Sequence, residues 1–96
     1  MPDPLSPAAI EQVLQSLEGW THAEGAIRKT FTFASFHEAV AFLVRVAFAA
    51  DAANHHPTLT NIYNRVTIAL STHDADNQVT AKDTGLATEI ECFSWV

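Results

Sequence analysis

The 96-residue chain is poor in cysteine, in basic residues and in glycine, and each shortage excludes a class of protein. A single cysteine, Cys92, rules out an internal disulfide and a cysteine-rich zinc module. Five Lys and Arg residues against eleven Asp and Glu give a formal charge of −6, so no basic patch is available for direct contact with nucleic acid. With only three glycines, the chain contains no Gly-rich phosphate loop.

Long hydrophobic runs are also missing. The longest, residues 39–50, is interrupted by Arg45 and is typical of a buried helix, well short of the ~20 residues that a membrane span needs. Residues 1–4 carry no positive charge and no apolar stretch of the kind that a secretory signal has. We therefore expect a cytoplasmic protein that does not bind membranes.

Apolar residues make up 48% of the chain, which excludes a disordered protein. The length predicts one domain that spans residues 1–96, without linkers or internal repeats. A chain this short buries only about 60–65% of its unfolded surface, so it gains stability from a partner subunit.

The first third of the sequence predicts a helix and two short strands. The helix begins at Pro7 after the N-cap Ser6 and is expected to end at Gly19. Its apolar face has helical spacing and consists of Ile10, Val13, Leu14 and Leu17. The strands lie within residues 20–33 on either side of a turn at Glu24-Gly25.

A second helix is predicted over residues 35–54, because Ser35 and Glu38 have capping-box spacing and Pro57 disfavours helix just before it. Two apolar stripes run along it. The first consists of Phe36, Val40, Leu43, Val44 and Ala47, and the second of Phe42, Val46, Ala49 and Ala53. A sheet can cover only one of the two, and we hypothesise that the second stripe packs in a subunit interface of a homodimer or homotetramer.

The last third predicts two strands, over residues 60–63 and 65–72, a polar loop over 74–78 and a final helix. Thr80 is the expected N-cap of that helix, with Asp83 at its third position. Its buried face consists of Leu86, Ile90 and Phe93. The whole order, α-β-β-α-β-β-α, predicts an α+β fold in which three helices pack on one face of a four-stranded antiparallel sheet.

Histidine is the residue type that points to chemistry, because it titrates near physiological pH and serves proton transfer and metal binding. Three of the five histidines, His55, His56 and His73, lie within nineteen residues. Asp51 precedes His55 by one helical turn, the spacing at which a carboxylate meets an imidazole. Pro57 extends the backbone at His56, so the two adjacent imidazoles leave the helix in different directions. The alternative is a pair of polar residues at the negative end of a helix dipole, and the two interpretations have about even odds.

The other candidates favour structural roles when each is taken alone. His73 is typical of an exposed strand end, and Asp83 favours helix capping over catalysis, although the two roles are compatible. His22 and His37 are expected to be solvated, and Cys92 is expected to be a small core residue. A zinc site formed by the three clustered histidines ranks below a metal-free site, because adjacent residues rarely bind one ion together.

Taken together, these positions resemble the signature of the pterin-4a-carbinolamine dehydratases. The matching residues are Asp51, His55-His56-Pro57, Tyr63, His73 and Asp83. Residues 61–66 and 70–73 are similar to that family as well, and the likeness is close from about residue 51 to residue 91. Two positions depart from the pattern: Leu59 stands where many members have an aromatic residue, and Asp51 replaces a longer glutamate.

The resemblance implies a lyase without cofactor or metal that removes water from a 4a-hydroxytetrahydropterin and yields the quinonoid dihydropterin in tetrahydropterin recycling. Such a reaction needs an acid and a base near neutral pH, and positioned imidazoles supply about 10²–10⁴-fold in rate. By this resemblance His55 and His73 transfer protons and His56 holds the substrate. The residues implied to contact the pterin are Asn54, Pro57, Ser71, Thr72 and Asp74.

The same resemblance gives supporting roles to Asp51, which would orient His55, and to Tyr63 and Asp83. It also leaves an alternative function open. Members of the family act as dimerisation partners of a transcription factor, so the chain could be a protein-interaction module, a transcriptional coactivator without catalysis. The doubly apolar helix suits such a contact, whereas three histidines at these positions favour the enzyme.

Overall fold

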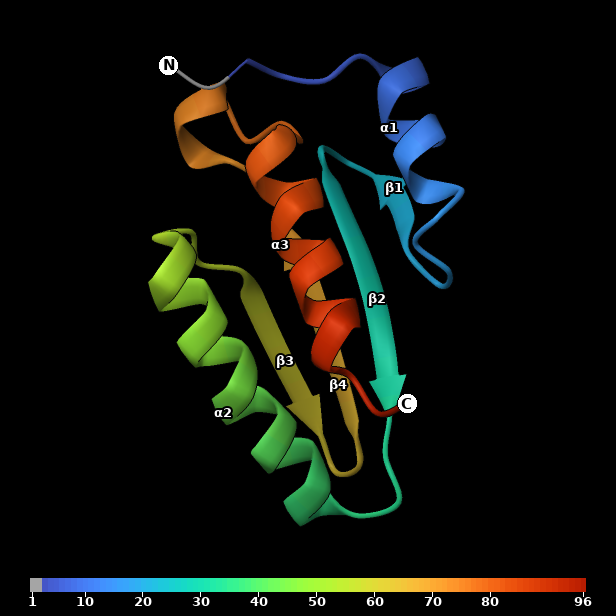
Figure 1. Ribbon diagram of the computed structural model, residues 1–96, viewed down its shortest axis with the longest axis vertical. Helices are drawn as coiled ribbons and strands as arrows, with labels where there is room; N and C mark the ends of the chain where they lie inside the picture. The colour runs from blue at the N-terminus through green and yellow to red at the C-terminus, as the bar shows by residue number, and fades with distance from the viewer. Residues whose placement is uncertain (1–2) are drawn as a thin grey trace.

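A computed structural model describes residues 3–96, and its element order and four-stranded antiparallel sheet confirm the predicted α+β fold (Figure 1). The sheet order is β1-β2-β4-β3. The helices are α1 (Pro7–Leu14), α2 (Phe36–Ala53) and α3 (Ala81–Phe93); the strands are β1 (Thr21–Ala23), β2 (Ala26–Thr32), β3 (Thr58–Ile62) and β4 (Arg65–Leu70); and a short 3-10 helix, η1, covers His73–Ala75. None of the helices in residues 3–96 combines the length and hydropathy that a membrane span requires.

Every second side chain of β4 points into the core, because side chains along a strand alternate between the two faces of the sheet. Val66, Ile68 and Leu70 are fully buried on the helical face. The predicted strand over 65–72 is too long by two residues, because β4 ends at Leu70 and Thr72 instead makes an isolated bridge to Gln78. The chain then enters η1, so residues 73–75 form a 3-10 helix. The sequence predicts these residues at the end of the strand and in the loop that follows it.

The predicted end of the first helix is also wrong. Helix α1 begins as expected, with the Ala9 N–H donating to Ser6 Oγ (3.1 Å), but it ends at Leu14 rather than at Gly19. The next turn is tighter, with the Leu17 N–H bonded to the Leu14 carbonyl (3.1 Å). Leu17 and Trp20, within and after this turn, are both buried in the core.

Helix α2 packs on the sheet through its second apolar stripe. Phe42 and Val46 are fully buried, and the Phe42 ring lies 4.8 Å from that of Phe31 on β2. The stripe that stays uncovered is the first, in which Phe36 and Val44 are 52% and 51% exposed. The subunit interface thus remains a prediction, and it now concerns this first stripe.

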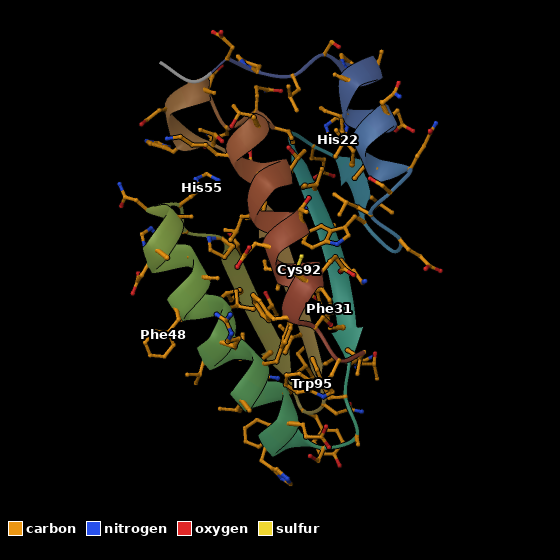
Figure 2. The ribbon with its side chains drawn as sticks, in the orientation of Figure 1. His22, Phe31, Phe48, His55, Cys92 and Trp95 are labelled. Carbon is orange, nitrogen blue, oxygen red and sulfur yellow. The ribbon has the colours of Figure 1, made fainter. Side chains whose placement is uncertain are left out.

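Helix α3 begins with the predicted N-cap, and Figure 1 shows it running antiparallel to α2, so that the end of α2 faces the beginning of α3. Leu86 and Ile90 are buried as predicted, and Phe93 is half-buried. The prediction of a buried Cys92 is wrong, because its side chain is exposed (Figure 2). Two residues past Ile90, it points about 200° around the helix axis, away from the core.

Candidate active site

The site forms where the end of α2 meets the beginning of α3. Asn54 closes α2 in the left-handed conformation (φ 49°, ψ 43°), which asparagine tolerates better than most residues. This reverses the chain, and the N–H of His55 bonds to the Ala50 carbonyl (3.0 Å). His55 is therefore only 9% exposed, at the end of α2 that faces α3 (Figure 2).

The imidazole of His55 contacts Asp83, the third residue of α3. His55 Nε2 donates to Asp83 Oδ1 over 2.5 Å, and Asp83 is fully buried. The second carboxylate oxygen, Oδ2, accepts from the Thr72 hydroxyl (2.8 Å) and from the Thr80 N–H (2.9 Å). One carboxylate therefore ties together the end of α2, the segment after β4 and the first turn of α3, and charged acceptors make the stronger kind of hydrogen bond.

The interpretation that Asp51 orients His55 is wrong. Asp51 Oδ1 instead accepts from His56 Nε2 over 3.0 Å. The expected spacing requires the helix to continue through His55, whereas Asn54 ends it and turns His55 inward. The Asp51–His56 pair is well exposed, so it contributes little to stability, but it holds the His56 ring in one direction.

A cleft of about 300 Å³ brings all three predicted histidines together. It is lined by Asn54, His55, His56, Ser71, Thr72, His73, Asp74 and Lys82. His73 reaches it from the first residue of η1, across from the end of α2. Seven of the eight lining residues are sequence candidates, and Asp83 lies behind them in contact with His55 and Thr72.

Lys82 is the lining residue that sequence reasoning missed. It lies in the first turn of α3, where its positive charge adds to the positive end of the helix dipole. A cation at that position is electrostatically unfavourable for the helix, and this signal was present in the sequence once Thr80 was identified as the N-cap. The positive charge of Lys82 is therefore explained by its position in the cleft, since the same charge is unfavourable for the stability of α3.

Besides Asp51 and Asp83, two more sequence candidates are not among the residues that line the cleft. Pro57 is half-buried and leads directly into β3. Tyr63 follows the other end of β3, a strand of five residues that spans about 16 Å, and is 67% exposed in the turn to β4. The extended strand carries Tyr63 away from the histidines, so the structure does not bring it to them. Leu59, within β3, is absent from the lining residues too.

The remaining histidines lie elsewhere, His22 on β1 and His37 at the start of α2. Within residues 3–96, no group of three or more His, Cys, Asp or Glu side chains is arranged to hold a metal ion. Nδ1 of His55 makes no hydrogen bond to a residue within 3–96 and is not fully buried, so it can bond to a ligand in the cleft.

Comparison with known proteins identifies the family. The sequence profile described as "Pterin 4 alpha carbinolamine dehydratase" matches residues 3–93. A protein of Opitutus terrae is 53% identical over 96 residues, which is 100% of this chain and 99% of its relative. A protein of a Roseiflexus species is 51% identical over 87 residues, covering 91% and 92%. Both carry the name "Putative pterin-4-alpha-carbinolamine dehydratase".

Solved structures agree with this assignment. The crystal structure of a "transcriptional coactivator/pterin dehydratase" from Brucella melitensis superimposes with a TM-score of 0.87 at 33% identity, covering 93% of this chain and 96% of the other. A pterin dehydratase-like RuBisCO assembly factor of the alpha-carboxysome, at 19% identity and a TM-score of 0.65, shares the fold. From the profile match and from 53% identity over the full chain, we conclude that the protein belongs to the pterin 4 alpha carbinolamine dehydratase family.

Proposed function

We propose that the protein dehydrates a 4a-hydroxytetrahydropterin to the quinonoid dihydropterin by histidine acid and base catalysis. In this reaction the bond between C4a and its hydroxyl breaks, the hydroxyl takes up a proton and leaves as water, and N5 of the ring gives up its proton. The observation that carries the proposal is the meeting of His55, His56 and His73, from two separate segments, around one cleft. Membership of the family supports the same reaction.

His55 and His73 are the proposed proton-transfer groups. Because Asp83 accepts the Nε2 proton of His55, the ring is fixed and Nδ1 is the nitrogen left for the substrate. His73 lines the cleft from η1, so one imidazole can protonate the leaving hydroxyl while the other accepts the N5 proton. This division of roles needs no further group, and positioned acids and bases supply about 10²–10⁴-fold in rate.

The remaining lining residues suit a flat heterocycle with several donors and acceptors. A volume of about 300 Å³ lies at the small end of the range for ligand sites and suits a bicyclic ring. The Asp74 carboxylate can accept the paired N–H groups of an aminopyrimidine edge, while Asn54 and Ser71 can bond its other polar atoms. His56, held by Asp51, is placed to bind rather than to transfer protons.

The test is a stopped-flow dehydration assay with a synthetic 4a-hydroxytetrahydropterin. We expect His55→Ala and His73→Ala each to lower turnover at least about tenfold, because each removes a proton-transfer group. His37→Ala is the matched control, since His37 is exposed at the far end of α2, and it should leave turnover unchanged. Wild-type turnover in both cleft variants would contradict these roles. A wild-type chain with no turnover above buffer would favour the interaction module instead.

A further inference from the structure

A second, wider groove opens beside the histidine cleft, between α2 and α3. Its volume is about 580 Å³, and its lining includes Arg45, Ala49, His55, Lys82, Gly85 and Glu89. His55 and Lys82 line both spaces, so the groove borders the cleft at these two residues. The proposed dehydration needs only the cleft, which leaves the groove without a role.

The lining residues of the groove continue away from the histidines along α2 and α3, which Figure 1 shows to be antiparallel. Arg45 lies eight residues before Ala53, the last residue of α2, which is about 12 Å along the helix axis. On α3, Glu89 lies seven residues after Lys82, or about 10 Å. A ligand whose ring sits in the cleft can therefore extend about one helical turn past Gly85 before it reaches Arg45 and Glu89.

Gly85 keeps the groove open. A Cβ atom placed on this residue would meet nothing within 4 Å, so the space above the helix is empty. Glycine inside a helix costs about 1 kcal/mol relative to alanine, and Gly85 occupies an exposed position where packing does not require it. On α2 the facing wall consists of Phe48 and of three small residues, Ala49, Ala52 and Ala53. An open apolar floor at this position is what an extended substituent needs.

The charges in the groove are unusual for so acidic a chain. Two of the five basic residues, Arg45 and Lys82, line it, and neither makes an ion pair with a carboxylate in residues 3–96. The Arg45 guanidinium carbon lies 4.3 Å from the centroid of the Phe93 ring, a cation–π contact, and none of its N–H groups bonds to a side chain in residues 3–96. The edge of a guanidinium binds carboxylate or phosphate with two parallel hydrogen bonds. Glu89 lines the same end and would oppose the anion.

We propose that the groove holds the C6 substituent of the pterin, and that the preferred substrate has a long substituent with an apolar or aromatic body that ends in an anion bound by Arg45. The anion is a carboxylate or a phosphate, which present the same oxygen pair to a guanidinium. The inference rests on the proposed function, because it places the pterin ring in the histidine cleft.

Equilibrium binding of stable dihydropterins tests the groove. The short probe is 6-methyl-7,8-dihydropterin, and the neutral longer one is 7,8-dihydroneopterin. The anionic probes are 7,8-dihydrofolate, with an aryl group and carboxylates, and 7,8-dihydroneopterin triphosphate. We expect at least one anionic probe to bind about tenfold or more tightly than the 6-methyl compound, since one bidentate charged contact is worth at least that much. The anionic probe that binds more tightly shows whether the groove prefers a carboxylate or a phosphate.

Two variants separate the charge from the space. Arg45→Gln should reduce the advantage of the anionic probe over the 6-methyl probe about tenfold, while Arg28→Gln, the same change at an exposed arginine on β2, should leave that ratio unchanged. Gly85→Leu should also reduce the ratio, because the new side chain occupies part of the groove, where its Cβ would meet nothing within 4 Å. Its melting temperature should equal or exceed that of the wild type, since leucine is the better helix former.

The outcomes distinguish this inference from the proposed function. If the 6-methyl probe binds and its 4a-hydroxy form is dehydrated, but no anionic probe binds more tightly, the groove inference alone is overturned. Equal effects of Arg45→Gln and Arg28→Gln overturn it as well. If neither dehydration nor binding of the 6-methyl compound occurs, the proposed function fails first. Unchanged affinity ratios in Gly85→Leu together with a smaller sedimenting species would assign the groove to a second copy of the chain and overturn the inference.

Discussion

The substitution Asp83→Asn is expected to reverse the position of the ring proton on His55. The Oδ2 atom of Asp83 accepts from the Thr80 N–H, which can only donate, and from the Thr72 hydroxyl. In the variant the amide oxygen must take this place, so the NH₂ group replaces Oδ1 and faces His55 Nε2. An amide nitrogen only donates, so Nε2 must become the acceptor and the ring proton moves to Nδ1, the atom that faces the substrate.

The expected cost to stability follows from the three hydrogen bonds to this carboxylate. All three keep a partner in Asp83→Asn but lose the negative charge, and the difference between a charged and a neutral hydrogen bond is about 1 kcal/mol. The free energy of unfolding should therefore fall by about 2–3 kcal/mol, which a domain stable by about 5–15 kcal/mol survives. Asp83→Ala, which leaves His55 Nε2 and the Thr80 N–H without an acceptor, should cost about 3–5 kcal/mol.

Three measurements check this prediction together. Urea unfolding gives the stability loss, ¹⁵N NMR of the imidazole reports which ring nitrogen carries the proton, and stopped-flow turnover should fall by about 10²–10⁴-fold. Asp76→Asn is the control, because Asp76 is exposed after η1 and loses the same charge. A folded Asp83→Asn protein with the proton on Nδ1 and wild-type turnover would refute the role given to His55.

Three further substitutions test separate parts of the structure. Gly25→Ala should lower the free energy of unfolding, measured in urea, by about 1–3 kcal/mol. The reason is that φ at Gly25 is +76° and the new Cβ would lie 2.4 Å from the Asn77 carbonyl oxygen. A more stable protein would contradict this. Asp51→Asn should leave the urea midpoint unchanged, since the pair of Asp51 with His56 is exposed. The substitution should raise KM, because the His56 ring loses the partner that holds it in one direction. An unchanged KM argues against this role of Asp51. Val44→Lys places a charge on the exposed first stripe of α2 and should therefore give a smaller species in sedimentation, with unchanged helical circular dichroism. An unchanged size would refute a subunit interface on this stripe.

The elements that the sequence predicted well are those that depend on neighbouring residues. All three helices begin at the expected N-caps, Ser6, Ser35 and Thr80, because a cap bonds only two or three residues along the chain. The alternation of side chains along β4 likewise indicates directly which of its residues are buried. The predicted end of the first helix was wrong, because it depends on how α1 packs against the rest of the fold. The predicted burial of Cys92 was wrong for a local reason, since helical spacing places it about 200° from the buried Ile90.

The same distinction explains the site. Its members were recognisable because histidines at these spacings are informative, and the resemblance to a known family located them. The partner of His55 was not predicted, because Asp83 is 28 residues away and meets it only through the packing of α3 against the end of α2. The i, i+4 rule favoured Asp51, and a single left-handed residue, Asn54, was enough to invalidate it.

The structure divides the site into a rigid part and an adaptable part. His55 is held by a carboxylate that also caps α3 and binds the segment after β4, so the contacts that position its ring are the contacts that stabilise the fold. His56, His73 and Lys82 are exposed and depend on no buried network. Substitutions around Asp83 should therefore change stability and turnover together, whereas substitutions of the exposed group should change activity at nearly constant stability. This coupling holds the buried imidazole in a position set by the fold itself, and the proposed proton transfer requires such a fixed position.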